Sequence, residues 1–411
     1  MALGIHLTAA VLMQGIATAI IFMLPILAKK EFAATDWQVA ILTAAPTIMF
    51  VVSIFWNEAL QRITLARFSL VYWAAACLPL GLIGALYYTP LRGQLWPLVV
   101  LQIIASIGGA GWPALNGELL KRVYSDSNRG RVYGIVSAVA MIGGALVMLG
   151  IGKWLDVSSS SYSLYLPLAA GLQLVAALLL GVLARYSGAE RPGTPQDSRT
   201  LLQHVMEPIS HMREVLAGDR VFARYEAAFM TYGIGWMVCY ALVPLLVTDK
   251  LKLSYDQIAG STHMTFLIAS TIMTVPAGWL MDKLGPSKMA CLSFGIYFAY
   301  PILLMLATNP TQLSFASAIY GIAAAGVSVC WMLGPVNLAP SPDKVPQYVA
   351  IHATLVGLRG AVFQFFGVWL YTATGSFYAP LTLAAAGFGW AAWQMWRLGP
   401  MMGMRGRLKK A

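Results

Sequence analysis

The chain has 411 residues, of which 59% are hydrophobic and only 10% are charged, and its mean hydropathy is +0.70. A soluble protein carries about 25% charged residues, so most of this chain has too little polar surface for an aqueous fold. The formal net charge of +11 does not require a nucleic-acid partner, because most Lys and Arg residues lie in connections on one predicted side of a membrane, as described below.

Apolar runs long enough to cross about 30 Å of hydrocarbon as helices follow one another along the sequence. The first run lacks a basic leader and continues into a polar hairpin, so we interpret it as a span and not as a cleaved signal. The pattern predicts an all-α polytopic membrane protein with twelve transmembrane helices, at 5–28, 37–57, 68–88, 95–117, 131–152, 163–185, 223–247, 256–281, 289–307, 312–338, 347–372 and 377–397.

Most of the 27 Lys and Arg residues lie in connections that are cytoplasmic if the N-terminus is inside. An excess of these residues marks the inner side of a membrane. We therefore expect both termini in the cytoplasm and the protein in a bacterial cytoplasmic (inner) membrane. The basic tail RGRLKK at 405–410 would then lie beside anionic lipid.

The longest polar stretch is 186–220, and it divides the spans into two groups of six. Its first part is a Gly/Pro-rich linker, and from Ser198 onward apolar residues recur at helical spacing, which predicts an amphipathic helix on the membrane face. The predicted domains are an N-terminal six-helix bundle at 1–188, a cytoplasmic linker at 189–221, and a C-terminal six-helix bundle with the basic tail at 222–411.

The two groups of spans resemble each other in sequence. LPILAKKEFAATDWQVA at 24–40 aligns without gaps on VPLLVTDKLKLSYDQIA at 243–259, an offset of 219 residues. The same offset pairs Trp112 with Trp331, in the fourth and tenth spans. Two matches at one offset indicate an internal duplication, as in many transporters.

GWLMDKLGPSK at 278–288, between the eighth and ninth spans, fits Gly-x-x-x-Asp-Lys-x-Gly-x-x-Lys. Together with the span count, the repeat and the central linker, this loop makes the chain resemble the major facilitator superfamily (MFS) over essentially its whole length. The resemblance implies two pseudo-symmetric six-helix bundles that rock about a midplane site. In the family, this loop latches the inward side of the transporter.

The residues of this loop are therefore expected to have gating or structural roles. Gly278 and Gly285 would allow close packing and a tight turn. Asp282 would cap a neighbouring helix N-terminus and pair with basic residues such as Lys283 and Lys288.

Two further sets of residues are gating candidates. NRGRVYG at 128–134, with Arg129 and Arg131, resembles the family's Arg-Gly-Arg loop, although basic residues beside a membrane are expected in any case. Trp112 and Trp331 lie in the inner halves of their spans and suit an inner constriction. Interfacial anchoring is the alternative for both tryptophans.

The sequence departs from the pattern of proton-coupled relatives. The first-half loop at 59–69 has Ile63 where its second-half counterpart has an aspartate, and the fourth span lacks the arginine that many such relatives carry. The 16 Asp and Glu residues lie in loops or near span ends, with Glu226 among the closest to hydrocarbon. We therefore expect a facilitator or an exchanger, with His263 and His352 as the intramembrane titratable candidates.

Arg359 stands near the middle of the apolar run at 348–366, about 18 Å of helix from either end. An arginine at that depth costs about 2.5–3.5 kcal/mol on insertion scales, so it needs a partner. One candidate is an anionic substrate, which a guanidinium binds in bidentate fashion. The other is a backbone carbonyl freed by a proline, such as that of Leu42. Similarity between the fifth and eleventh spans, which sets Arg359 against Gly143, favours a structural or gating role.

Other residues are candidates because they are polar or aromatic at mid-depth in spans that line the cavity in the family. The predicted substrate-binding residues are Arg359, His352, Gln14, Gln102, Tyr232, Trp236, Tyr240 and His263.

The sequence shows no metal-ligand spacing, nucleophile triad or paired carboxylates, and its four cysteines lie in apolar runs. We predict that the protein is not an enzyme, has no cofactor or metal, is a monomer, and has a small-molecule substrate and the lipid bilayer as partners. The predicted function is alternating-access transport of a small organic solute, most simply an organic anion. The alternatives are a transport-inactive assembly factor or scaffold, and an exporter of lipids or drugs.

Overall fold

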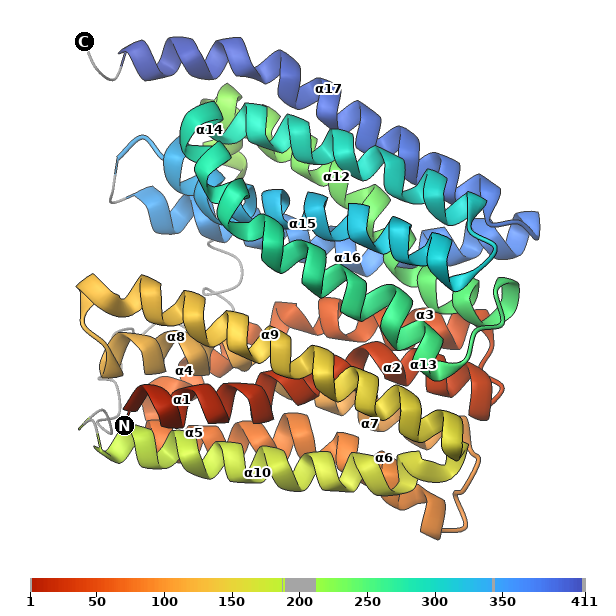
Figure 1. The fold of residues 1–411 in the computed structure, drawn as a ribbon. Coiled ribbons are helices and arrows are strands. Elements are labelled where there is room, and N and C mark those ends of the chain that lie inside the picture. The colour runs from red at the N-terminus through yellow and green to blue at the C-terminus, as the bar shows by residue number, and fades with distance from the viewer. Residues whose placement is uncertain (1, 187, 189–211, 342–343, 409–411) are drawn as a thin grey trace. The chain divides into compact units, whose positions relative to one another are not determined.

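A computed structural model describes residues 2–186, 188, 212–341 and 344–408, which form helices joined by short connections (Figure 1). Within these ranges, nine helical segments are long and apolar enough to cross a membrane. One of them, Tyr255–Leu306, contains both the eighth and the ninth predicted spans. The predicted spans 37–57 and 377–397 are outside the nine, although both are helical. The all-helical fold is confirmed.

Contacts divide the chain into two compact units. The first comprises the described residues up to position 188 together with Val247–Met264, and the second comprises the described residues of 212–246 and 265–408. The two predicted six-helix bundles stay a prediction, because most of the linker at 189–221 lies outside the described residues. The same holds for the amphipathic helix predicted from Ser198 and for the side chains of the basic tail.

The first unit contains ten α-helices from the N-terminal part of the chain and one from Val247–Met264. They are α1 (Ala2–Ala10), α2 (Ile16–Glu31), α3 (Asp36–Ile48), α4 (Ser53–Arg62), α5 (Leu65–Tyr72), α6 (Leu78–Ala85), α7 (Leu95–Gly109), α8 (Trp112–Val123), α9 (Asp126–Val157), α10 (Tyr162–Tyr186) and α13 (Tyr255–Ile258).

π-Helical turns interrupt the spans of the first unit. η1 (Val11–Gly15) joins α1 to α2, η3 (Trp73–Cys77) joins α5 to α6, and η7 (Ala259–Met264) follows α13. Such turns are rare and frequently mark functional sites. Two of the predicted site residues lie in them, Gln14 in η1 and His263 in η7.

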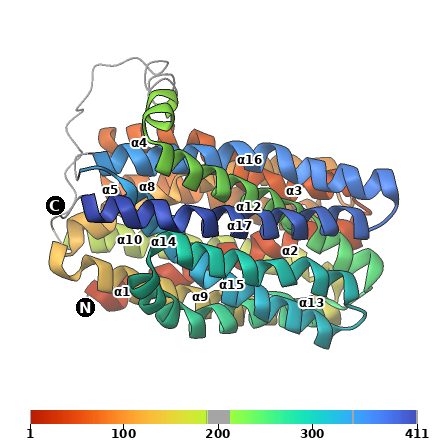
Figure 2. The same ribbon diagram turned by 90° about the horizontal axis from the view of Figure 1, so that it is seen from above.

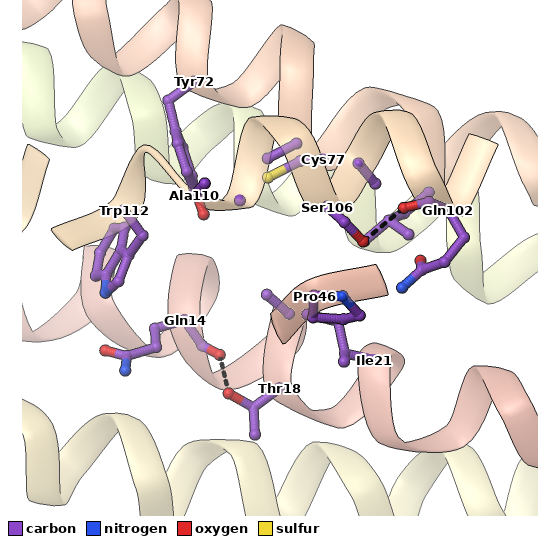
Figure 3. Close-up of a pocket in the computed structure, with 15 residues that line it drawn as sticks. Gln14, Thr18, Ile21, Pro46, Tyr72, Cys77, Gln102, Ser106, Ala110 and Trp112 are labelled. Carbon is purple, nitrogen blue, oxygen red and sulfur yellow. Dashed lines mark hydrogen bonds between the residues drawn. The ribbon is translucent and has the colours of Figure 1, made fainter. Parts of the chain in front are cut away.

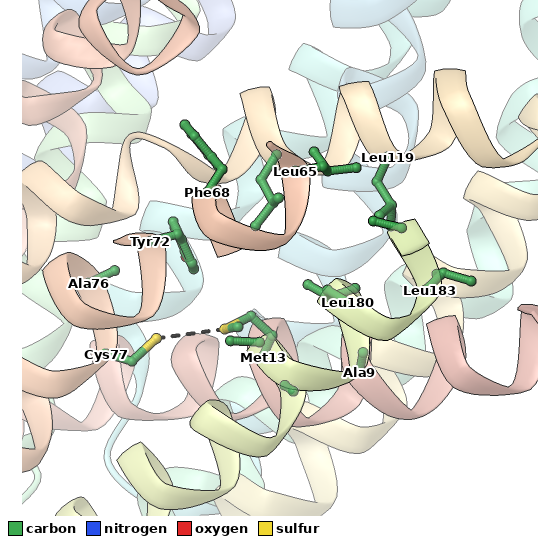
Figure 4. Close-up of a cluster of buried hydrophobic side chains, with 14 of the residues drawn as sticks. Ala9, Met13, Leu65, Phe68, Tyr72, Ala76, Cys77, Leu119, Leu180 and Leu183 are labelled. Atoms are coloured by element: carbon green, nitrogen blue, oxygen red, sulfur yellow. Dashed lines mark hydrogen bonds between the residues drawn. The ribbon is translucent and has the colours of Figure 1, made fainter. Parts of the chain in front are cut away.

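An apolar core holds the first unit together where α1, α5, η3, α8 and α10 meet (Figure 4). Met13, Phe68 and Leu183 are fully buried there, and the thiol of Cys77 donates to the sulfur of Met13 at 3.7 Å. In a bilayer these side chains stabilise the unit through van der Waals packing, because lipid tails are as apolar as the side chains themselves. Cys77, Cys239 and Cys330 are buried and Cys291 is partly buried, as expected of cysteines in apolar runs.

The second unit consists of α12 (Arg220–Leu245), α14 (Thr265–Leu306), α15 (Pro310–Leu338), α16 (Val345–Thr374) and α17 (Tyr378–Leu408). α14 packs against α15 and α17, and α12 packs against α16 and α17 (Figure 2). α14 breaks at Gly285, whose φ of 74° is readily accessible only to glycine.

The repeated segments adopt the same local structure. Ala33 has φ of 48° and Lys252, 219 residues later, has φ of 50°, a conformation that is uncommon outside glycine. Two residues on in each segment, a hydroxyl side chain begins a helix with a capping box, Thr35 with Gln38 and Ser254 with Gln257. Matching backbone strain and matching caps at one offset support the internal duplication.

Removing either cap should destabilise the first unit. We expect Thr35→Ala and Ser254→Ala each to cost about 1 kcal/mol, because an N-terminal amide of the following helix loses its acceptor. Thermal unfolding of the purified protein measures the loss. Thr354→Ala is the matched control, because the Thr354 hydroxyl bonds only within its own helix, to the carbonyl of Ala350. Equal effects of all three substitutions would contradict the capping role.

Candidate functional site

Arg359 is buried in the second unit, where α16 packs against α12. Its exposed fraction is 7%, and Nη1 donates to the carbonyl oxygen of Phe229 at 2.6 Å. The guanidinium lies over the ring of Tyr232, 5.6 Å from its centroid, while Nε is buried without a hydrogen-bond partner among the described residues. The carbonyl partner belongs to the interior of α12 and is not one freed by a proline, so the expectation of a carbonyl such as that of Leu42 is wrong.

The missing side chain of Gly233 makes room for this guanidinium. A Cβ on Gly233 would lie 1.9 Å from Cζ of Arg359, far inside van der Waals contact. α12 and α16 run parallel, because residues 126 apart face each other twice: Glu226 bonds to His352, and Gly233 lies against Arg359.

The corresponding contact in the first unit contains no charge. A Cβ on Gly15 would lie 2.9 Å from the carbonyl oxygen of Ala140 and 3.0 Å from the amide of Gly144, so two backbones pack directly. Gly143, which the sequence sets against Arg359, instead lies beside Val11. The second unit therefore has a polar cluster at a helix contact, whereas this contact in the first unit is made by backbone atoms.

Glu226 and His352 form a buried pair beside Arg359. Their exposed fractions are 2% and 1%, and Nδ1 of His352 lies 2.9 and 2.8 Å from the two carboxylate oxygens of Glu226. Glu226 is also close enough to Arg359 to interact with it electrostatically. Arg359 therefore has an acidic neighbour, although the Asp and Glu residues lie in loops or near the ends of the predicted spans.

The aromatic residues predicted on α12 form part of a larger cluster. The ring of Tyr232 stacks on Phe294 with centroids 4.6 Å apart, and Trp236 stacks on Tyr240 at 5.2 Å. Nε1 of Trp236 donates to the hydroxyl of Tyr320 at 2.8 Å. Tyr320 was not predicted, because it lies on α15 and only the packing of that helix brings it to Trp236.

A cavity of about 230 Å³ within the first unit brings together Gln14, Gln102 and Trp112 (Figure 3). Tyr72 and Ser106, which the sequence analysis missed, also line it. Gln102 is 1% exposed and its Oε1 has no hydrogen-bond partner in the part of the chain that the structure describes. The described residues of the lining offer amide and hydroxyl groups and no charged side chain, so they suit an uncharged polar group.

A polar network lies at the end of the first unit where α2 meets α3 and the segment Val247–Met264. Nζ of Lys29 lies 2.6 Å from Asp36 and 3.1 Å from Asp249, and Lys30 donates to the carbonyl of Leu253. The hydroxyl of Tyr255 donates to Glu31 at 2.8 Å. In addition, Asp156 at the end of α9 accepts the backbone amides of Tyr255 and Asp256 at 2.7 and 2.8 Å. His263 lies in the same segment, with its ring 5.1 Å from that of Phe22.

The loop at 278–288, called the signature loop below, does not make all the contacts that the resemblance implies. A Cβ on Gly278 would meet no atom within 4 Å, so the close packing expected there is absent. Asp282 is exposed and makes no hydrogen bond or ion pair with another described residue, so it is not a helix cap in this conformation. Lys283 lies over the ring of Trp279 at 3.5 Å, and Lys288 lines a basic cavity of the second unit with Arg224.

The remaining gating candidates occupy separate positions. Trp331 is partly exposed, and its ring lies 5.5 Å from that of His352. Trp112 is the first residue of α8, and its ring centroid lies 5.8 Å from that of Tyr72. Arg131 is exposed, while the side chain of Arg129 lies outside what the structure describes.

The membrane-spanning helices define a polytopic membrane protein with buried polar clusters. The sequence matches the family model of the Major Facilitator Superfamily over residues 7–260 and 227–402. The chain therefore belongs to the major facilitator superfamily, whose members are secondary transporters and not enzymes. A search among curated proteins found no match.

Solved structures of MFS transporters have the same fold. The nucleoside transporter NupG, solved as a mutant, aligns with a TM-score of 0.73 at 13% identity over 98% of this chain and 100% of its own. A POT family transporter in complex with 5-aminolevulinic acid has a TM-score of 0.73 at 12% identity, covering 98% and 95%. A D-xylose–proton symporter has a TM-score of 0.66 at 16% identity, covering 96% and 97%. At these identities the likeness establishes the fold alone.

Proposed function

We propose that this secondary transporter moves a small organic anion by alternating access, with Arg359 as the anion-binding group. The observation that supports it is the partly occupied guanidinium: Nη1 bonds to Phe229, while Nε has no partner among the described residues. A guanidinium has five N–H donors in a planar fork that matches a carboxylate or phosphate. A carboxylate that approached the Nε side would supply the missing acceptor.

We further propose that the other predicted residues hold the uncharged part of the solute. Gln14 and Gln102 offer amide groups in the first-unit cavity, and Oε1 of Gln102 has no hydrogen-bond donor among the described residues. Tyr232, Trp236 and Tyr240 offer aromatic surface in the second unit. His263 stays a candidate on its sequence alone. The proposed setting is a bacterial cytoplasmic membrane with both termini inside, on the distribution of Lys and Arg.

Ligand-induced stabilisation tests the proposal. Purified protein should be stabilised by at least one member of a panel of succinate, benzoate, glutamate and glycerol 3-phosphate, because a ligand that binds only the folded state raises Tm. Arg359→Ala should abolish that stabilisation while the variant remains folded. Gln102→Leu should weaken it without abolishing it, because an uncharged hydrogen bond contributes less than an ion pair.

Counterflow of the same labelled compounds in proteoliposomes then measures transport. Wild-type protein should exchange the stabilising anion, and Arg213→Ala, which replaces an exposed arginine, should exchange it at the wild-type rate. Stabilisation by neutral solutes alone, unchanged in Arg359→Ala, would overturn the assignment of an anionic substrate. Folded protein that exchanges no compound of any charge would favour the transport-inactive alternative.

A further inference from the structure

We infer that the basic cavity of the second unit is a binding site for one anionic phospholipid of the surrounding leaflet. The cavity has a volume of about 1530 Å³ and is formed by residues of α12, α14, α15 and α17. Its described lining does not include Arg359. The inference therefore goes beyond the proposed function and does not depend on it.

Basic side chains from three helices line this cavity. They are Arg224 on α12, Lys288 on α14 and Arg397 on α17, and all three are exposed. Nη1 of Arg224 lies 2.8 Å from the sulfur of Met401, and the guanidinium of Arg397 lies over the ring of Trp393, 4.4 Å from its centroid. None of the three cations forms an ion pair with an acidic residue in the described ranges, and the described lining contains no Asp or Glu. An anionic ligand would supply the counter-charge that these residues lack.

The three cations lie at the depth of lipid headgroups. Each is within one residue of a predicted span end, at 223, 289 and 397, and all three ends are on the side predicted to be cytoplasmic. Trp396, which also lines the cavity, is 67% exposed, and tryptophan is enriched at membrane–water interfaces. Basic pockets between spans on this side of a membrane bind the headgroups of anionic lipids.

The break in α14 adds to the positive potential of the cavity. The second half of α14 begins after Gly285, so Ser287 and Lys288 lie in its first turn, and all three residues line the cavity. The N-terminus of a helix carries a partial positive charge that attracts anions. A phosphate near Lys288 would therefore be attracted by this helix as well as by the three cations.

Apolar side chains continue the cavity away from the charges. Leu284 and Leu292 line it and are 38% and 43% exposed. Leu292 is four residues beyond Lys288, so it lies on the same face of α14 and about 6 Å further along the helix. That direction leads into the predicted span 289–307 and therefore into hydrocarbon. A phospholipid fits both parts, with its phosphate near Lys288 and an acyl chain along Leu292, whereas free phosphate would leave the apolar part uncovered.

Native mass spectrometry of the full chain in detergent tests the site. The protein should bind phosphatidylglycerol more tightly than phosphatidylcholine with the same acyl chains, and a higher ammonium acetate concentration should weaken this binding, because salt screens exposed charges. Arg224→Gln, Lys288→Gln and Arg397→Gln should each weaken the first binding step about fivefold, the contribution of one basic residue to anionic-lipid binding. Arg220→Gln is the matched control, because Arg220 is exposed one turn before Arg224 and is not among the residues that line the cavity.

A competition measurement separates a lipid from a soluble phosphate. A large molar excess of inorganic phosphate should leave phosphatidylglycerol bound, and its displacement would overturn the lipid assignment in favour of a soluble anion. Equal affinities for the two lipids, or equal affinities of Arg220→Gln and the three cavity variants, would overturn the site itself. Three variants of exposed side chains keep the test decisive if one of them does not fold. No transported anion is present in these measurements, so their result is separate from that of the proposed function.

Discussion

Gly233→Ala is expected to destabilise the protein and to abolish anion-induced stabilisation, although alanine favours a helix over glycine. The new Cβ would lie 1.9 Å from Cζ of Arg359 and 2.0 Å from Nη1. The guanidinium cannot move aside freely, because it is buried and bonded to Phe229. Overpacking of this kind costs about 1–3 kcal/mol, against about 1 kcal/mol gained in helix propensity.

A double-mutant cycle isolates the contact. In an Arg359→Ala background the clash is gone, so the same Gly233→Ala change should become neutral or stabilising by up to about 1 kcal/mol. Apparent Tm values of the four proteins give the coupling. Gly295→Ala is the matched control, because a Cβ at Gly295 on α14 would meet no atom within 4 Å. If Gly233→Ala and Gly295→Ala gave the same Tm, Arg359 would not occupy the position described.

The helical spans and the duplication could be predicted from the sequence because both depend on local information. Hydropathy over about twenty residues decides whether a helix suits hydrocarbon. The repeated hairpin is fixed by short-range features, such as the caps that begin at Thr35 and Ser254, which each segment carries within itself. Single breaks such as that at Gly285 follow from one residue type.

The polar cluster could not be predicted, because it depends on which helices pack together. Glu226 stands six residues after the start of α12. From the sequence alone, this position indicates a side chain near the membrane–water boundary and not one in the protein interior. A weak signal was available: Glu226 and Gly233 are seven residues apart, as are His352 and Arg359, so each pair lies on one face of its helix. Only the parallel packing of α12 on α16 makes these two faces meet.

In the signature loop the sequence motif predicts contacts that this conformation lacks, whereas the polar cluster was present but not predicted. Gly278 has open space around it, and Asp282 has no partner among the described residues. A latch is made in one state of a transport cycle and released in another, so one conformation does not show both. The polar network around Lys29 was absent from the sequence-based predictions for the reverse reason: it depends on residues more than 200 positions apart.

Lys29→Met is expected to release the segment Val247–Met264 from α2 and α3. Lys29 is the cation between Asp36 and Asp249, and the side chains of the three residues are only 18%, 25% and 31% exposed. Without it, two half-buried carboxylates lose the cation that they share. Loss of hydrogen bonds between charged groups costs about 1.5–3 kcal/mol each, so local opening of this segment should become about tenfold more frequent or greater.

Hydrogen–deuterium exchange resolves this opening, since it reports on each segment separately. Peptides that cover Val247–Met264 should exchange faster in Lys29→Met, while peptides from α16 should not change. In an Asp249→Asn background the same substitution should have a smaller effect, because only Asp36 is then left without its partner. Lys153→Met is the control for loss of an exposed lysine from the same unit.

Release of this segment should also alter transport, because it connects α12 to α14 in the chain, and connections between helices absorb conformational changes. Asp156 and Tyr255 hold the segment at two further points, so Lys29→Met should loosen it without unfolding the unit. Gating substitutions of this kind change kcat and KM together. If hydrogen exchange and transport kinetics of Lys29→Met both equalled those of Lys153→Met, the network would stabilise the segment no more than an exposed ion pair does. Such pairs contribute at most about 1 kcal/mol.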